Sequence, residues 1–368
     1  MNNSKETCLY DEESPAYMPG AFSDVYVERS ALEHSRTGMI LSRLNGKTPP
    51  AIHEINSYKD VFYRSSHNTI NNSIDICTGT GNNAAPDRSG HGINGGTLIL
   101  ARKKDHYIFR GSPVCQDFDE KHFYYASSAM NCIYDCEYCY LKGMYPSAHI
   151  VIYVNPEDTF DEIDGMLNQH PMYVCISYDT DLPALEGITG LVRDWAEFAL
   201  SRRELRIECR TKCARTDLWD ELPVNENFIL AFTLSPTEIA DRYEHRAPSL
   251  SARLVSIEKA IAAGHPVRLC FDPVIHTKDW EEIYAAMIDE VRTGLDLSEV
   301  RDISIGTFRI SQNYLRRMRR NMPDSPPVNF PFETENGVCV YPDYLRNKMT
   351  DFMIRRLSEI VPGERIYT

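Results

Sequence analysis

From residue 149 onward the sequence alternates between two kinds of segment, and this alternation restricts the fold more than any other feature. Apolar runs of strand length occur at 149–155, 172–178, 206–212, 228–234, 267–275 and 302–308. Amphipathic runs of helix length lie between or after them, at 156–169, 185–203, 250–264, 279–294 and 311–321. Strands that alternate with helices form a parallel sheet joined by right-handed crossovers. The sequence therefore predicts an α/β protein built around a partial TIM-type (β/α)6 barrel.

Two extensions flank this alternating segment. The N-terminal part is loop-rich and contains a polar Asn/Gly stretch at 71–96. The Pro-rich stretch at 323–333 predicts an extended connector before a last helix at 344–360. We therefore expect an N-terminal extension over 1–118, the partial barrel over 119–310, and a C-terminal extension over 311–368 that completes the substrate side.

Composition and charge narrow the class of protein. The chain has 42% hydrophobic and 25% charged residues, which is ordinary for a soluble globular protein. No apolar run approaches the roughly 20 residues that span a bilayer, and the polar start MNNSKETCLYDEESP does not resemble a secretion signal. We expect a cytoplasmic monomer with no membrane partner. The net charge of −14 argues against broad attraction to phosphate backbones, so any nucleic-acid site must be local.

The cysteines indicate a metal site. The chain has 11 cysteines, an odd number at irregular spacing, which favours reduced thiols over a disulfide framework. Cys132, Cys136 and Cys139 form a C-x3-C-x2-C motif in a loop that follows a strand. Three such thiolates can bind three irons of a [4Fe-4S] cluster and leave the fourth iron open. A structural zinc ion is the alternative, but it needs four ligands, and no partner CxxC or HxxxH pair is evident at a suitable distance.

The cysteine motif and several other blocks carry a resemblance to a known family. C-x3-C-x-aromatic-C, with Tyr138 as the aromatic residue, resembles the signature of the radical SAM superfamily. The blocks DVYVERSALEH, SSHNTINN, CEYCYLKGMYPSAHIVIYVN, LRIECRTK, FILAFTLS, YEHRAPSLSAR and PGERIYT resemble the spore photoproduct lyase family in order. The resemblance implies a radical SAM barrel that binds a [4Fe-4S] cluster and S-adenosyl-L-methionine. It also implies that S-adenosylmethionine is cleaved reductively to a 5'-deoxyadenosyl radical, which abstracts a substrate hydrogen.

The resemblance assigns further residues to the cofactor. Tyr138 and Tyr140 match aromatic residues that contact the cofactor or lie on the radical path, while core packing is a compatible second role. Lys212 matches a strand-end lysine that pairs with the methionyl carboxylate, and a solvated surface lysine is the alternative. Thr180 and Thr233 match two cofactor-binding serines, although both could be ordinary strand threonines. Four more residues recur in the family pattern and could be structural or functional: Asp181, Glu244, Arg246 and Arg253.

The resemblance fails at the hydrogen donor. Family members use a cysteine in a Cys-Thr-Ser-Asp motif, and Tyr178 stands at that position here. Cys175 lies three residues earlier, and strand alternation predicts that it points to the opposite face as a core thiol. Cys115 lies upstream of the motif, where some divergent lyases carry an alternative donor. We therefore take Cys115, Tyr178 and Tyr140 as candidate catalytic residues, with an incidental loop thiol as the alternative reading of Cys115.

The C-terminal segment also departs from the family, because a Trp-Gly-Arg-Tyr-Gly-type stretch that holds the lesion is replaced by GVCVYPDYLRNK. Tyr341, Tyr344 and Arg346 could substitute in part. Arginines at 316, 317, 319 and 320 could meet phosphates or simply solvate a helix.

Three functions follow from these features. The first is a lyase that splits a methylene-bridged thymine dimer in damaged DNA. The second keeps the cofactor chemistry but acts on a peptide, a modified nucleoside or a small metabolite, and the third is a non-catalytic iron-sulfur protein. The two enzymatic functions require an external one-electron donor such as flavodoxin or ferredoxin.

Overall fold

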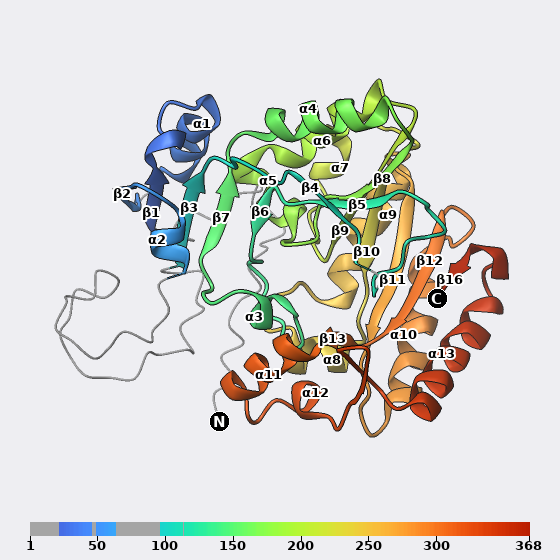
Figure 1. Ribbon diagram of the computed structural model, residues 1–368. Coiled ribbons are helices and arrows are strands. Elements are labelled where there is room, and N and C mark those ends of the chain that lie inside the picture. Colours follow the sequence, from blue (N-terminus) through green and yellow to red (C-terminus); the bar gives the residue numbers. More distant parts are fainter. Residues whose placement is uncertain (1–21, 46–48, 64–95, 113) are drawn as a thin grey trace.

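An eight-stranded sheet forms the centre of the molecule (Figure 1). The computed structural model describes residues 22–45, 49–63, 96–112 and 114–368. The strands of the central sheet follow the order β16-β12-β11-β10-β9-β8-β5-β4. Their bounds are β4 (Ile108–Arg110), β5 (Phe123–Ala126), β8 (Met172–Cys175), β9 (Leu205–Thr211), β10 (Phe228–Thr233), β11 (Val267–Val274), β12 (Asp302–Thr307) and β16 (Ile366–Tyr367).

The pairing of these strands confirms the predicted α/β class. Strands β5, β8, β9, β10, β11 and β12 are parallel to one another, and β16 continues the parallel sheet beyond β12. Strand β4 is antiparallel to β5 at the other edge. Because β4 and β16 do not pair with each other in the described part of the chain, the sheet is a partial barrel.

Helices are present in all four ranges predicted between strands, 156–169, 185–203, 250–264 and 279–294. The helices of this part are α4 (Pro156–Leu167), α5 (Leu182–Thr189), α6 (Leu191–Leu200), α7 (Leu218–Glu221), α8 (Thr237–Tyr243), α9 (Leu250–Ala262) and α10 (Trp280–Gly294). The second range is divided into two helices, and the short helices α7 and α8 were not predicted. Side chains at their N-termini satisfy free backbone donors, since Asp181 accepts from the Ala184 amide at 3.2 Å and Ser249 accepts from the Ala252 amide at 3.2 Å. Gly190, with a φ of 66°, makes the sharp break between α5 and α6.

A second sheet of five strands lies beside the barrel, in the order β2-β1-β3-β7-β6. Its strands are β1 (Phe22–Glu28), β2 (Ala51–Ile55), β3 (Gly96–Ala101), β6 (Ala129–Met130) and β7 (Ile150–Tyr153), accompanied by η1 (Arg29–Ala31), α1 (Ser35–Leu44) and α2 (Lys59–Phe62). The apolar run at 149–155 therefore does not belong to the barrel, because β7 pairs with β3. All four residues of β7 are buried, and a run that is apolar on both faces does not encode which neighbour it pairs with. The FYYA segment of β5 supplies the first barrel strand instead.

The C-terminal extension adds a small sheet and three helices. Strands β13 (Arg309–Ser311), β14 (Glu333–Glu335) and β15 (Val338–Val340) form an antiparallel sheet with β15 in the middle. The helices are α11 (Gln312–Asn321), α12 (Pro326–Asn329) and α13 (Asp343–Ser358), and η2 (Gly363–Arg365) precedes β16. The helices predicted at 311–321 and 344–360 are confirmed, whereas the predicted extended connector at 323–333 contains the short helix α12. The domain boundaries at residues 118 and 310 stay predictions.

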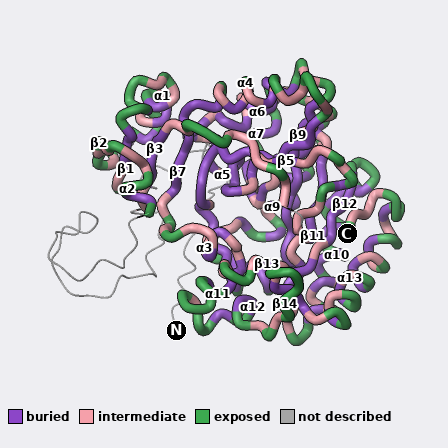
Figure 2. The backbone as a smooth tube through the Cα atoms, in the orientation of Figure 1, coloured by how far each residue is buried: buried purple, intermediate pink, exposed green. Residues whose placement is uncertain are grey.

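Burial along the barrel strands separates an apolar outside from a polar inside. In β9, Leu205, Ile207 and Cys209 are fully buried, while Glu208 and Arg210 alternate with them and hydrogen-bond other strands. Figure 2 shows that buried backbone is concentrated in the strands and in the helix faces that cover them. Both charged side chains of β9 pair with residues of β11: Glu208 accepts from Arg268 at 2.6 Å, and Arg210 donates to Asp272 at 3.4 Å. Among the described residues, every helix is too short or too polar to span a lipid bilayer.

Candidate active site

The three motif cysteines lie in a loop between β6 and α3 (Leu141–Met144). Asn131 opens this loop with a φ of 66°, and its side-chain amide donates to the carbonyls of Ser147 and His149 at 2.9 and 2.8 Å. The Glu137 amide donates to the carbonyl of Tyr243 at 2.8 Å, so the loop is also held by the last residue of α8. The side chain of Cys136 is buried, and those of Cys132 and Cys139 are partly exposed.

Glu244 is the centre of a buried polar cluster beside this loop. Its carboxylate accepts from Lys212 Nζ at 2.7 Å, from Ser235 Oγ at 2.6 Å, and from the Tyr138 hydroxyl and the Arg253 guanidinium. Burial alone raises the pKa of Glu244, but the cations Arg253 and Lys212 lower it well below the usual range. Glu244 is therefore a permanent carboxylate held between two cations.

Lys212 joins this cluster to the cysteine loop. Its ammonium lies 2.8 Å from the Tyr138 hydroxyl, 3.6 Å from Cys136 Sγ and 4.9 Å from the centre of the Tyr138 ring. The side chain is mostly buried, so the alternative of a solvated surface lysine is wrong. Its position at the end of β9, next to the loop, agrees with a role in binding an anionic group there.

The chemistry of the loop fits an iron-sulfur cluster. Burial raises the pKa of Cys132, Cys136 and Cys139, that of Cys136 to about 12, so thiolates there need a bound cation. A structural zinc ion takes four ligands, and the loop itself supplies three cysteines. Three thiolates that each bind a different iron of a cubane cluster match this set of ligands.

Two predicted cofactor residues, Thr180 and Thr233, and the undecided residue Asp181 lie at or after the C-terminal ends of barrel strands. The buried Thr180 hydroxyl has no hydrogen-bond partner among the described residues, so it is free to bind a polar ligand. Thr233 is buried at the end of β10, and its carbonyl accepts from Arg253 at 3.1 Å. Asp181 is fully engaged by Thr211 Oγ1 and the Lys212 amide, both at 2.7 Å, which makes it a structural residue.

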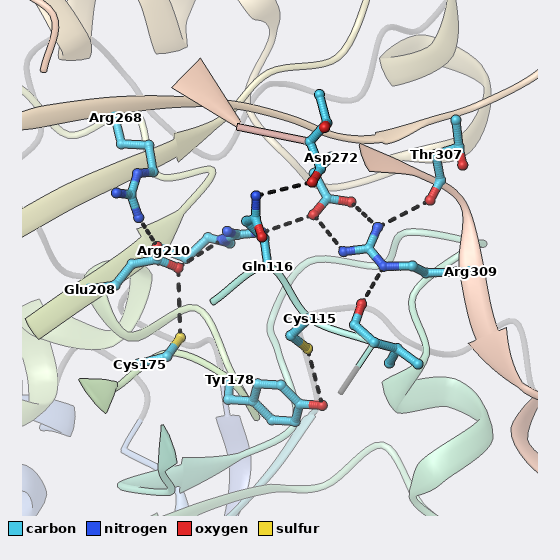
Figure 3. A network of polar contacts seen from close by, with 12 residues as sticks. Cys115, Gln116, Cys175, Tyr178, Glu208, Arg210, Arg268, Asp272, Thr307 and Arg309 are labelled. Carbon is cyan, nitrogen blue, oxygen red and sulfur yellow. Dashed lines mark hydrogen bonds and ion pairs between the residues drawn. The ribbon is translucent and has the colours of Figure 1, made fainter. Parts of the chain in front are cut away.

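The candidate donors form a second cluster. The Cys115 thiol donates to the Tyr178 hydroxyl at 3.8 Å, as drawn in Figure 3. The Tyr178 ring stacks on Tyr125 at 4.3 Å and lies 5.6 Å from the Tyr140 ring, and the Tyr140 hydroxyl donates to the Tyr178 carbonyl. Tyr140 follows Cys139 directly. The structure therefore brings Cys115, Tyr178 and Tyr140 together and connects them to the cysteine loop.

Charged residues hold the Cys115 segment in place (Figure 3). Arg309 donates to the Val114 carbonyl and forms a bidentate ion pair with Asp272, at 2.9 and 3.1 Å. Arg210 approaches the same carboxylate at 3.4 Å. Burial raises the pKa of the Cys115 thiol, against the opposing effects of the Tyr178 hydrogen bond and of Arg309 and Arg210. Cys115 is accordingly a neutral thiol with an S–H bond.

Cys175 requires a correction. It is buried, as predicted for a core thiol, but it does not point away from the other candidate residues. Its Sγ lies 3.9 Å from Glu208 Oε1, which also accepts from Arg210 at 3.1 Å, and Figure 3 shows Cys175 in the same region of the site as Cys115 and Tyr178. Strand alternation fails here because β8 ends at Cys175, so the period of two does not extend to Tyr178.

The sequence reasoning left Glu244 and Arg253 undecided and missed Asp272 and Arg309. The barrel strands do contain a sequence pattern that indicates buried ion pairs. Charged residues alternate with apolar ones in RIECRTK and VRLCFDPVI, and a charged residue in a buried strand needs a partner. The partners come from distant segments, which the pattern does not identify.

The three residues of the C-terminal segment that could substitute for the lesion-binding stretch have other partners. Tyr341 is buried among Phe308, Phe330 and Phe332, and its hydroxyl accepts from the His276 amide at 3.0 Å. Tyr344 is 76% exposed, and Arg346 pairs with Asp343 and Glu335. None of the three contacts Cys115 or Tyr178 in the described structure.

Six parallel strands of a partial barrel, with a three-cysteine loop after the first of them and a lysine at a strand end beside it, define the radical SAM class of protein. The comparisons with known proteins identify the family within this class. A family model described as spore photoproduct lyase matches residues 118–328. The chain belongs to the spore photoproduct lyase family.

Individual relatives agree with this membership. The spore photoproduct lyase of Clostridium acetobutylicum is 22% identical over 202 residues, which are 53% of this chain and 59% of that protein. A solved spore photoproduct lyase variant with bound AdoMet and dinucleoside spore photoproduct is 19% identical, with a TM-score of 0.74 over 96% of this chain and 98% of that one. A second solved variant of the lyase gives a TM-score of 0.76 at 18% identity over the same shares. At these identities the structural matches establish the shared fold.

Proposed function

We propose that this protein is a radical SAM lyase that splits the methylene bridge of 5-thyminyl-5,6-dihydrothymine in damaged DNA. The observation that carries the proposal is the continuous contact from the cysteine loop through Tyr140 and Tyr178 to Cys115. Membership of the family supports it. So do the solved family structures that contain the dinucleoside spore photoproduct, one of them together with AdoMet.

The first cluster holds the cofactors in this proposal. Cys132, Cys136 and Cys139 hold a [4Fe-4S] cluster, and Lys212 meets the carboxylate of S-adenosylmethionine. The free hydroxyl of Thr180 and the buried Thr233 bind other polar groups of the same molecule, and the ring of Tyr138 packs beside Lys212. When bound, the cluster and S-adenosylmethionine supply a 5'-deoxyadenosyl radical that abstracts hydrogen from the lesion.

The second cluster returns a hydrogen atom to the product. The S–H bond of Cys115 breaks and a C–H bond forms on the thymine radical, which leaves a sulfur-centred radical on Cys115. The Tyr178 hydroxyl, 3.8 Å from Cys115 Sγ, can give its own hydrogen atom to that sulfur. The O–H bond breaks, the S–H bond re-forms, and the unpaired electron moves to the Tyr178 phenoxyl oxygen. A hydrogen atom from the methyl group of 5'-deoxyadenosine, or an electron and a proton from an external reductant, would then restore the phenol. Tyr140 connects Tyr178 to the cysteine loop through its hydrogen bond to the Tyr178 carbonyl. Arg309 and Asp272 fix the Cys115 segment during these steps.

The proposal includes the cellular setting. The enzyme works as a monomer in the cytoplasm, where thiols stay reduced, and the cysteines of the described residues are free thiols. Flavodoxin or ferredoxin supplies the electron. The substrate is a lesion in DNA that is presented outside its base stack.

The test is an anaerobic assay on the reconstituted and dithionite-reduced protein. We expect the dinucleoside spore photoproduct to be converted to two thymidines, with 5'-deoxyadenosine formed in the same samples. Formation of 5'-deoxyadenosine with an untouched dinucleoside would assign the enzyme to another substrate. A fully reconstituted protein that forms neither product would overturn the radical SAM assignment itself.

Cys115→Ala tests the hydrogen donor within that assay. Loss of the donor should leave 5'-deoxyadenosine formation intact but reduce the yield of repaired thymidine at least about tenfold in favour of abortive products, because the product radical has no nearby S–H bond. Cys339→Ala is the matched control, since Cys339 is a buried thiol that contacts Thr334 on β14 instead. Equal repair yields in Cys115→Ala and in the control would exclude Cys115 as the donor.

A further inference from the structure

Helix α11 carries four arginines next to the cysteine loop. Arg316, Arg317, Arg319 and Arg320 are all exposed. Helix α11 packs on α3, the helix that begins two residues after Cys139, and Figure 1 shows the two side by side. The contact is close, because a Cβ on Gly143 of α3 would lie 2.5 Å from the Tyr314 carbonyl oxygen. Arg317 fixes it further by donating to the carbonyls of Gly143 and Met144 at 3.2 and 3.3 Å.

The charge of these arginines is not neutralised within the described structure. Arg319 donates to the carbonyls of Val328 and Phe330 at 3.1 and 2.7 Å, and Arg316 donates to the Asn313 side chain at 3.3 Å. None of the four forms an ion pair with a described carboxylate, and helix α11 contains no acidic residue. The chain has a net charge of −14, so its carboxylates outnumber its cations. In a chain with this net charge, a helix face that carries only positive charge attracts anions locally.

The arginines also line a groove. A cavity of about 390 Å³ lies between α11 and the hairpin of β14 and β15. Arg316, Arg319 and Arg320 line one side of it, and Phe332 and Thr334 line the other. Guanidinium groups bind phosphate in a bidentate manner, a hydroxyl adds a further hydrogen bond, and an aromatic ring packs on a sugar or a base. The groove therefore combines the groups that recognise a nucleotide backbone.

We propose that the arginine face of α11, together with this groove, binds the sugar-phosphate backbone of DNA that flanks the lesion. The assignment of the flanking strand rests on the proposed lyase function, whereas the attraction to DNA does not. The negative charge of the rest of the chain repels DNA elsewhere, so the α11 face orients the strand with respect to the adjacent cysteine loop. An acidic electron-transfer protein is the competing partner, but a groove of this size suits single phosphate groups better than a flat protein surface.

The experiment measures binding of a fluorescent undamaged duplex to the full chain over a series of salt concentrations. Arg316→Gln/Arg319→Gln/Arg320→Gln should weaken binding at least about tenfold and lower the slope of log affinity against log salt by about 2 to 3. The matched control is Arg203→Gln/Arg292→Gln/Arg355→Gln, which removes the same charge from exposed arginines outside α11 and should change affinity less than about twofold. An unchanged slope in the α11 variant, or an equal loss in the control, would overturn the proposal.

A second variant tests whether weaker binding results from local unfolding instead of lost charge. Arg316→Gln/Arg320→Gln keeps Arg319 and its two backbone hydrogen bonds, so the fold around α12 is retained. It should still lower the salt slope by about 1 to 2. If this variant instead binds duplex normally but is no longer reduced by an acidic flavodoxin, the α11 face belongs to the electron donor and the DNA proposal is wrong.

Turnover separates this proposal from the proposed lyase function. The α11 variants should lose activity on a lesion within a duplex and keep activity on the dinucleoside lesion, which has no flanking backbone. If the unmodified protein repairs neither substrate while duplex binding still depends on the α11 arginines, the lyase assignment fails and the DNA surface stands. If the variants lose activity equally on both substrates, the arginines act on the site itself and the backbone proposal fails.

Discussion

The candidate site has two halves, one around the three cysteines and one around the candidate hydrogen donors. Each half contains a buried carboxylate between two cations, but the cations of the two halves hold different groups. In the cysteine half, Glu244 lies between Lys212 and Arg253, and in the donor half Asp272 lies between Arg210 and Arg309. In each half, one carboxylate between two cations keeps buried charges paired.

The difference lies in what the cations hold. Lys212 reaches the side chains of Cys136 and Tyr138, so the first unit acts directly on the cysteine loop. Arg309 instead reaches the backbone of Val114, 195 residues earlier in the chain, so the second unit acts by fixing a segment. The three cysteines of the first half come from one contiguous motif, whereas the candidate donors Cys115, Tyr140 and Tyr178 come from separate segments. Mutations should therefore have unequal effects on the two halves.

The largest effect is expected for Cys136→Ala. Removing one of three thiolates removes an iron ligand, so the protein should lose its cluster absorbance and bound iron, and 5'-deoxyadenosine formation should fall to background. Iron analysis and anaerobic chromatography measure both quantities. Cys115→Ala, in the other half, should retain its iron. If Cys136→Ala binds as much iron as the parent chain, the loop is not the cluster site and the comparison of the halves loses its basis.

The second-largest effect is expected on the free energy of unfolding. Glu244→Gln leaves Lys212 and Arg253 buried without a negative partner, which should lower the free energy of unfolding by about 3 to 5 kcal/mol. Urea denaturation of the cluster-free protein measures this change, with the exposed Glu290→Gln as a control that should stay within about 0.5 kcal/mol. A loss as small as that of the control would mean that the Glu244 cluster does not stabilise the loop.

The contrast between the halves also explains what the sequence could predict. The alternation of strands and helices predicted the parallel barrel, because each β/α unit is encoded locally. It did not predict that β7 leaves the barrel, because pairing with β3 depends on a segment 52 residues earlier. The cysteine motif identified its loop for the same local reason. Asp272 and Arg309 were missed because their pairing depends on the curvature of the sheet, although the charged positions in VRLCFDPVI and RIECRTK marked the strands involved.

The smallest effect should come from Tyr178→Phe, which keeps the ring stacked on Tyr125 and removes only the hydroxyl beside Cys115. The loss of one weak hydrogen bond should change the free energy of unfolding by about 1 kcal/mol or less. Burial raises the pKa of Cys115, and the hydrogen bond to Tyr178 lowers it. Without the hydroxyl the pKa should rise further, so the thiolate fraction at a given pH falls. The rate of iodoacetamide alkylation of Cys115 should therefore reach half its maximum at a higher pH than in the parent chain, with the other cysteines followed separately by mass spectrometry. A shift to lower pH would mean that Tyr178 does not stabilise the thiolate, and that the two side chains are not in contact in solution.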